Sequence, residues 1–175
     1  MSKQFLYIIT GLPYSGKTTL TKELIKRFGF IVASVDEVME EGHYSSEKMN
    51  QDDWNYVYSE AYRRLKQYLL DGKTVIFDGG SLLQSERNTI KGIAEKAGVK
   101  SKLVYVKVAK EEIKKRWIDN QITKVRDHLV EETINQALSM FEEPTTDEYP
   151  IIYDQEMDIE LWISCNIENW NNEIR

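Results

Sequence analysis

Apolar residues along the chain gather in short continuous runs, separated by longer segments with helical spacing. Four runs predict strands at Phe5–Ile9, Phe30–Val35, Thr74–Phe77 and Leu103–Val108, because a strand buried on both faces of a parallel sheet lacks polar alternation. A fifth strand is expected at Ile159–Ile163. The pattern therefore favours a sheet whose strands are mostly buried.

The segments between these runs carry apolar positions three or four residues apart, as amphipathic helices do. They are Thr18–Phe28, Asp53–Leu70, Ser85–Ala97 and the heavily charged Glu111–Phe141. Strands that alternate with helices imply right-handed crossovers and a parallel sheet covered on both faces. We therefore expect one α/β domain over residues 1–175, a three-layer αβα sandwich with a five-stranded parallel sheet, and a helical lid near Lys110–Asp127.

The octapeptide between the first strand and the first helix matches the phosphate-binding pattern G-x-x-x-x-G-K-[ST] at every specified position. Gly11 and Gly16 let the backbone bend so that successive N–H groups point at phosphate oxygens. Lys17 can reach the β- and γ-phosphates, and the Thr18 hydroxyl can ligate magnesium. A chance match would occur in roughly one chain in a few hundred. We therefore assign nucleotide binding to Gly11, Leu12, Pro13, Tyr14, Ser15, Gly16, Lys17, Thr18 and Thr19.

Two aspartates, Asp36 and Asp78, follow predicted strands. Ligands of an open parallel sheet bind beyond the carboxyl ends of its strands, so we expect both carboxylates at the same edge as the phosphate-binding loop. Asp78 follows Val75–Phe77 as a metal-holding Walker B aspartate does, although an aspartate that caps the next turn gives the same pattern. Asp36 is a candidate general base toward the attacking hydroxyl, with a helix N-cap and a second metal contact as alternatives.

These residues resemble the small P-loop kinases grouped with polynucleotide kinase, zeta toxin and chloramphenicol phosphotransferase, which share an AAA-like ATP-binding domain. The resemblance covers nearly the whole chain and rests on Gly11–Thr18, Ser34–Asp36, Gly72–Asp78, Arg87, Arg116 and Phe141–Pro144. It implies the P-loop nucleoside triphosphate hydrolase fold with the strands in kinase order. It also implies ATP and Mg²⁺ as cosubstrates, Asp36 as the base, and lid arginines that close over the phosphates.

The lid departs from the family pattern, which often has two arginines about one helical turn apart. Arg116 matches the first, Asn120 stands where the second is expected, and Arg126 is a substitute farther along. A solvated helix face is the alternative for Arg116, and a structural ion pair is the alternative for Arg87. Relatives also place an asparagine shortly after the Walker B aspartate, where this chain has Gly79–Ser81. Substrate contacts at that point are expected from backbone groups or from the serine.

Aromatic residues are frequent in the segment 42–62. Their rings fit the wall of an acceptor pocket, but aromatic residues at helical spacing more often belong to a core. We expect core packing for Tyr58 and Tyr62, and both interpretations stay open for His43 and Tyr44.

Composition bears on partners and location. The formal net charge of −6 and the pI of about 5.1 do not favour nucleic acid as a partner, because polyanions are attracted by broad positive fields. The single cysteine, Cys165, excludes an intrachain disulfide and fits a reducing compartment. With no apolar run long enough to cross a bilayer, we expect a cytoplasmic protein without membrane contact.

The residues and the resemblance together predict an ATP-dependent kinase that transfers the γ-phosphoryl group to a hydroxyl of a small-molecule or nucleoside-type acceptor. The expected catalytic residues are Lys17, Asp36, Arg116 and Arg126, and the expected metal ligands are Thr18 and Asp78. Two alternatives stay open: a 5′-hydroxyl polynucleotide kinase, and a nucleotide-binding NTPase or switch without an acceptor. The switch would need a positioned water, for which Gln84 is the nearest candidate after Asp78.

Overall fold

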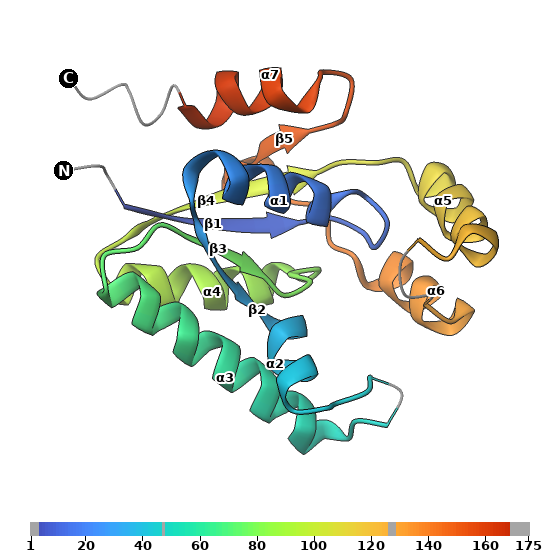
Figure 1. Cartoon of the computed structure of the whole chain (residues 1–175), viewed down its shortest axis with the longest axis horizontal. Helices are drawn as coiled ribbons and strands as arrows, with labels where there is room; N and C mark the ends of the chain where they lie inside the picture. The colour runs from blue at the N-terminus through green and yellow to red at the C-terminus, as the bar shows by residue number, and fades with distance from the viewer. Residues whose placement is uncertain (1–3, 47, 126–128, 169–175) are drawn as a thin grey trace.

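The computed structural model describes residues 4–46, 48–125 and 129–168. Within these residues the chain forms a five-stranded, all-parallel sheet in the order β2-β3-β1-β4-β5 (Figure 1). The strands are β1 (Phe5–Thr10), β2 (Ile31–Ser34), β3 (Val75–Asp78), β4 (Lys100–Val106) and β5 (Ile151–Tyr153). The α/β class and the five-stranded parallel sheet expected from the apolar runs are therefore confirmed.

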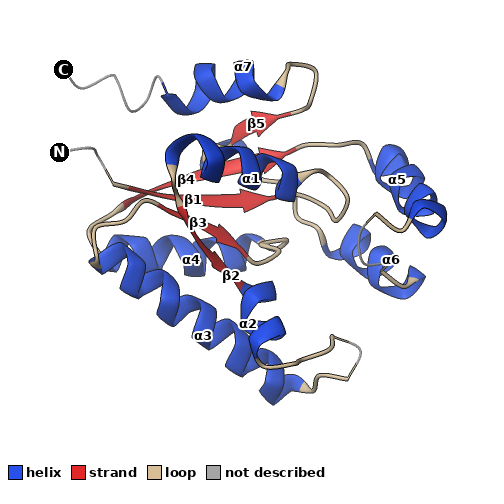
Figure 2. Ribbon diagram, in the orientation of Figure 1, coloured by secondary structure: helices blue, strands red, loops and turns tan. Residues whose placement is uncertain are grey.

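Helices cover both faces of this sheet (Figure 2). They are α1 (Lys17–Phe28), α2 (Val35–Glu41), α3 (Gln51–Leu70), α4 (Gln84–Lys96), α5 (Lys110–Thr123), α6 (Glu131–Met140) and α7 (Ile159–Ile163). One face carries α1 and α7, and the other carries α3 and α4, whereas α5 and α6 lie beyond the carboxyl ends of the strands. No helix in the described part of the chain is long and apolar enough to cross a membrane.

The side chains of β1 alternate between the two faces and are buried on both. Tyr7 packs with Leu20 of α1 and Trp162 of α7, whereas Leu6 packs with Leu65 of α3. Burial on both sides explains why the strand appears in the sequence as an uninterrupted apolar run.

A third, smaller core lies outside the sheet. Leu12 and Tyr14, which belong to the phosphate-binding loop, pack there with Ile113 of α5 and with Ile134 and Leu138 of α6. The two helices beyond the strand ends are therefore attached to the loop itself by buried apolar contact.

The start of α3 is defined by local polar contacts rather than by the apolar pattern. The Asn50 side chain accepts hydrogen bonds from the backbone N–H groups of Asp52 and Asp53 at 2.8 and 3.0 Å. The Asp53 carboxylate in turn accepts from the Asn50 N–H at 3.0 Å. This capping box lets the helix begin at Gln51, slightly earlier than its apolar residues indicate.

The expected fifth strand at Ile159–Ile163 is wrong, because these residues form α7. The Asp158 carboxylate accepts from the N–H groups of Glu160 and Leu161 at 2.9 and 3.2 Å and so caps a helix at this point. Trp162 then lies buried against the sheet. The real fifth strand, β5, has three residues, which are too few to show a strand pattern.

The segment Glu111–Phe141, which the sequence predicts to be largely helical, contains two helices, α5 and α6. Lys124 ends α5 in the left-handed conformation with φ of 49°. The indole N–H of Trp117 then donates to the Leu129 carbonyl at 2.7 Å, which ties the following segment back to α5. The expected lid, Lys110–Asp127, thus corresponds to α5 and the turn after it, of which residues 126–128 lie outside the described part.

Candidate functional site

The loop between β1 and α1 has a backbone that only glycine allows at two points. Gly11 and Gly16 have φ values of 148° and 100°. A Cβ atom on Gly11 would lie 2.6 Å from the Val106 carbonyl oxygen of β4. The loop is closed by a hydrogen bond from the Ser15 N–H to the Leu12 carbonyl at 3.2 Å. Strand, glycine loop and helix therefore follow one another as a phosphate-binding loop requires.

Lys17 brings a positive charge to this loop. Its ammonium donates to the carbonyl oxygens of Gly11 and Leu12 at 2.7 and 2.9 Å. The Ser15 hydroxyl is buried inside the loop and has no hydrogen-bond partner among the described residues. A cation, a helix N-terminus and an unpartnered buried hydroxyl in one loop fit a phosphate group.

Asp78 lies at the end of β3, directly beside the end of β2, where Ser34 is its register partner. Burial raises the pKa of the Asp78 carboxyl, the Lys17 ammonium lowers it, and the Asp36 carboxylate raises it again. The structure therefore brings together Lys17, Asp36 and Asp78, as the sequence predicted. Their arrangement at the carboxyl edge of the sheet is where ligands of such folds bind.

Asp36 does not end a strand and does not cap a helix. β2 ends at Ser34, and the Ser34 hydroxyl accepts from the Glu37 N–H at 3.3 Å, so the serine is the N-cap of α2. Asp36 is the second residue of that helix and its side chain is exposed. The carboxylate is therefore free of a capping role and faces solvent near Asp78.

Tyr58 links the aromatic residues of α3 to this edge. Its hydroxyl donates to the carbonyl of Gly79, the residue after Asp78, at 3.3 Å. Burial raises the pKa of Tyr58 to about 12, and the charges of Glu86 and Asp36 add to the effect. Tyr58 and its neighbour Tyr62 pack against the core as expected, but the Tyr58 hydroxyl also forms part of the site.

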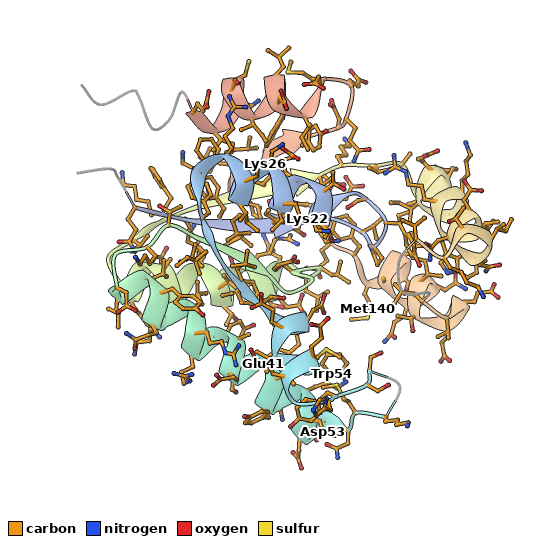
Figure 3. The ribbon with its side chains drawn as sticks, in the orientation of Figure 1. Lys22, Lys26, Glu41, Asp53, Trp54 and Met140 are labelled. Carbon is orange, nitrogen blue, oxygen red and sulfur yellow. The ribbon has the colours of Figure 1, made fainter. Side chains whose placement is uncertain are left out.

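The two aromatic positions that stayed open have different surroundings. His43 is exposed and has a left-handed backbone with φ of 54°. Tyr44 is half-buried against the core, and its ring lies 6.2 Å from that of Tyr56. Trp54, in the first turn of α3, lies 6.2 Å from the Tyr58 ring, and Figure 3 places it near the end of α2.

Arg87 has a structural role. It is buried, with 2% of its surface exposed, and it forms a two-pronged ion pair with Glu148 at 2.7 and 2.9 Å. It also donates to the carbonyls of Ser81, Leu82 and Glu142 at 3.0 to 3.2 Å. The interpretation as a structural ion pair is the one that these contacts support.

Arg116 lies on the outer side of the phosphate-binding loop. Its guanidinium donates to the carbonyls of Tyr14 and Ser15 at 3.2 and 3.5 Å, and to the Gln155 side chain at 2.9 Å. It also pairs with Glu112, one turn earlier in α5, at 2.9 Å. The loop presents N–H groups to phosphate, whereas Arg116 contacts its carbonyls and so attaches α5 to the loop.

Asn120, which stands where a second lid arginine was expected, is buried and faces the Tyr14 hydroxyl with an N–O distance of 3.5 Å. The same hydroxyl accepts from the Leu129 N–H at 3.3 Å. An arginine at this position would not fit between α5 and the loop without displacing Tyr14. Arg126, the proposed substitute, lies outside the described residues.

Gln155 is a site residue that the sequence analysis missed. It follows β5, has a left-handed backbone with φ of 68°, and donates from its amide to the Ser15 carbonyl while accepting from Arg116. A Cβ atom on Gly16 would lie 2.9 Å from its amide nitrogen. Correct placement of β5 would have put this loop at the carboxyl edge of the sheet and drawn attention to Gln155.

The metal site expected at Thr18 and Asp78 is compatible with the residues present. Thr18 is exposed in the first turn of α1, at the same edge as the Asp78 carboxylate. The described residues contain no group of three or more His, Cys, Asp or Glu side chains that could hold a metal. Magnesium fits better than zinc, because it is usually held by one or two protein oxygens together with phosphates and water.

Comparison with known proteins agrees with this geometry. A family model described as an AAA domain matches residues 6–144, which contain the phosphate-binding loop, Asp36, Asp78 and Arg116. A search of curated proteins finds no match. Solved structures, in contrast, resemble the chain over nearly its whole length.

Three of these solved structures are described by their sequence identity, coverage and TM-score. A protein from Chloroflexus aurantiacus, provisionally named a kinase, is 17% identical, with a TM-score of 0.75 and 98% of each chain covered. Kti12 from Chaetomium thermophilum, solved with ADP-AlF3, is 17% identical, with a TM-score of 0.72 over 95% of this chain and 97% of that chain. A gluconokinase from Sinorhizobium meliloti is 12% identical, with a TM-score of 0.64 over 99% and 98%. At these identities the likeness shows a shared P-loop kinase fold.

Proposed function

Because the chain belongs to the AAA domain family, we propose that it is an ATP-dependent kinase that transfers the γ-phosphoryl group to a hydroxyl of a small-molecule or nucleoside-type acceptor. The placement of Lys17, Asp36 and Asp78 around one edge of the sheet supports this most directly. Phosphoryl transfer needs phosphate-binding donors, charge neutralisation and a group that orients the nucleophile, and each has a candidate here.

The phosphate-binding loop would hold the triphosphate of ATP. Its N–H groups, the Ser15 hydroxyl and the Lys17 ammonium are the donors at this point. Lys17 would exchange its contacts with the Gly11 and Leu12 carbonyls for phosphate oxygens, which are stronger acceptors because they are charged. Thr18 and Asp78 would hold Mg²⁺, which supplies neutralisation of charge on the β- and γ-phosphates.

Asp36 would orient and deprotonate the acceptor hydroxyl. Its carboxylate is exposed, makes no capping contact and lies near Asp78. Tyr58 and Gly79 would form the adjoining wall, since the tyrosine hydroxyl is bonded to the Gly79 carbonyl. A base of this kind contributes roughly 10²- to 10⁴-fold to rate.

The lid arginines would neutralise charge that develops during transfer. Arg116 is the candidate among the described residues, and it would have to leave the Tyr14 and Ser15 carbonyls to reach the phosphates. Arg126 is the second candidate. The attachment of α5 and α6 to Leu12 and Tyr14 makes any such movement depend on the loop itself.

A transfer screen with γ-labelled ATP and Mg²⁺ tests the proposal. The acceptors are separate pools of nucleosides, sugars, aminoglycoside and phenicol drugs, and 5′-hydroxyl oligonucleotides. We expect label to move to one small-molecule pool and to be lost in Lys17→Met but not in Lys22→Met, which removes a lysine from the exposed face of the same helix. Label released only as free phosphate in every pool would favour the NTPase or switch instead.

A further inference from the structure

A cavity of about 570 Å³ lies apart from the phosphate-binding loop, between α4, the first half of β4 and the turn Thr146–Glu148. None of residues 11–19 lines it. Its volume falls within the range of roughly 300–1,000 Å³ in which proteins bind small organic molecules.

The cavity exists because the chain leaves this part of the sheet uncovered. After β4 the chain continues beyond the strand ends to α5 and α6, so within the described residues no helix that follows β4 covers this face (Figure 1). β5 pairs with Val104–Val106, and in the described part of the chain no strand pairs with the side of Lys100–Leu103 that faces away from β1. Backbone N–H and C=O groups along such an edge are available to hydrogen-bond a ligand.

Apolar residues form the floor of the cavity. Ile8 and Leu103, register partners on β1 and β4, line it from the α4 side of the sheet. Ser101 pairs in register with Leu6, whose side chain lies on the α4 side of the sheet, so the serine points toward α4. A flat apolar group would pack on this floor.

Polar residues line the opposite wall. Gln84, Arg87, Asn88 and Lys91 recur on one face of α4. Arg87 is fully engaged by Glu148 and three carbonyls. Lys91 lies close enough to Glu148 to help lower its pKa, and it is exposed at the rim.

The charged residues that line the cavity sum to a positive charge, whereas the net charge of the molecule is negative. The Arg87–Glu148 pair cancels, Asp147 contributes one negative charge, and Lys91, Lys100 and Lys102 contribute three positive charges. Lys91 lies on α4, whereas Lys100 and Lys102 follow the register of Phe5 and Tyr7 and point to the α1 side of the open strand edge. The chain as a whole carries −6. The field at this place therefore attracts an anion, although the net charge of the molecule is negative.

We propose that this cavity is a second ligand site, which binds a small organic anion with a flat apolar body. The body would lie on Ile8 and Leu103, and a carboxylate, sulfonate or phosphate group would face Lys91 of α4. Arg87 connects the site to the candidate active site, because it also holds the Ser81 carbonyl, which accepts from Thr10 directly before the phosphate-binding loop. A ligand in the cavity would therefore contact Arg87, the residue that holds the loop after Asp78 through the Ser81 carbonyl.

Binding of anilinonaphthalene sulfonate, an aromatic anion, tests the site in the full chain by fluorescence titration at low salt. Three variants are compared with the wild type. Lys91→Glu reverses the rim charge, Ser101→Phe fills the floor, and Lys22→Glu is the matched control on α1, on the other face of the sheet (Figure 3). We expect the dissociation constant to rise roughly tenfold in Lys91→Glu, and saturable binding to be lost in Ser101→Phe. Lys22→Glu should behave as the wild type.

Amide exchange locates the bound probe. We expect slower exchange in α4 and in residues 147–151 of the wild type, with or without saturating ATP. Lys91→Glu, an exposed substitution, keeps the test valid if Ser101→Phe fails to fold. Unchanged affinity in Lys91→Glu, or displacement of the probe by ATP, would overturn the proposal, whether or not the protein proves to be a kinase.

Discussion

Burial raises the pKa of the Asp78 carboxyl above its ordinary value, and Asp36 adds to this effect while Lys17 opposes it. A carboxyl whose pKa is higher in the folded than in the unfolded chain makes the free energy of unfolding fall as pH rises through the folded pKa. At pH 7 the charged Asp78 therefore costs stability. A position that lowers stability in this way is typical of a functional residue.

Asp78→Asn is therefore expected to stabilise the fold at pH 7, because burial disfavours the charged carboxylate. The gain should shrink as pH falls through the folded pKa, because the wild-type carboxyl is then neutral as well. Urea unfolding of both proteins across pH measures the difference. An Asn variant that is less stable than the wild type at pH 7 would show that the contact with Lys17 outweighs burial.

In contrast to the charged Asp78, which lowers stability, the ion pair between Arg87 and Glu148 is expected to stabilise the fold. Arg87→Met removes both hydrogen bonds that the guanidinium donates to the Glu148 carboxylate, whose side chain is 11% exposed, and the bond to the Glu142 carbonyl. We expect a loss of about 3–5 kcal/mol in the free energy of unfolding. Arg63→Met, which breaks a pair between an exposed arginine and Glu60 on the surface of α3, should cost much less. Equal losses in urea unfolding would contradict the structural role of Arg87.

The same pair makes stability depend on acid. Arg87 holds the pKa of Glu148 below its ordinary value of 4.5, so the stabilisation is present above the unfolded pKa and is lost as pH falls through the folded one. Arg87→Met should therefore lose less stability than the wild type when pH is lowered through this range. If Arg87→Met lost as much free energy of unfolding as the wild type when pH is lowered, carboxyl groups other than Glu148 would be responsible for that loss.

Elements with long apolar runs were predictable, and those set by local polar contacts or by distant neighbours were not. β1, β3, β4 and α1 could be predicted from their apolar positions and from the glycines near their ends, which are visible in the sequence. β5 is too short to show a pattern, and the Asp158 cap turns the next apolar residues into α7. The break between α5 and α6 depends on the contact of Trp117 with Leu129, which periodicity does not reveal.

The candidate site also contains residues that the sequence indicated and residues that only the folded structure brings together. The phosphate-binding loop is a contiguous motif, so all of its residues could be named from the sequence. The contacts of Arg116 with Tyr14 and Gln155 join segments 102 and 39 residues apart and depend on how the lid folds back. The sequence therefore indicated Asp36 and Asp78, which stand next to recognisable apolar runs, and did not indicate Gln155, which follows the three-residue β5.

The attachment of α5 and α6 to the loop gives a prediction about the lid. Ile134 is buried in the small core with Leu12 and Tyr14. Ile134→Ala should destabilise that core by roughly 2–5 kcal/mol, and amide exchange in α5 and α6 should accelerate while β1 and β4 stay protected. Thr133→Ala, an exposed neighbour in α6, is the control. Acceleration spread evenly over the sheet would show that the lid does not open as a separate unit.

The net charge of the molecule favours a small acceptor over a nucleic acid. A net charge of −6 opposes long polyanions, whereas a small acceptor meets only the local field of the site. We expect a 5′-hydroxyl oligonucleotide to bind weakly even at low salt, as measured by fluorescence anisotropy. Tight binding that weakens steeply with salt would reveal a basic groove and favour the polynucleotide kinase alternative.

The central claim, that Asp36 serves phosphoryl transfer at the edge where Lys17 holds ATP, is tested most directly by comparing Asp36→Asn with Glu37→Gln. Both remove one exposed carboxylate from the first turn of α2. For Asp36→Asn we predict a transfer rate lower by roughly 10²- to 10⁴-fold with nearly unchanged ATP affinity, and for Glu37→Gln a rate close to that of the wild type. An Asp36→Asn protein that keeps most of its transfer rate would contradict the account.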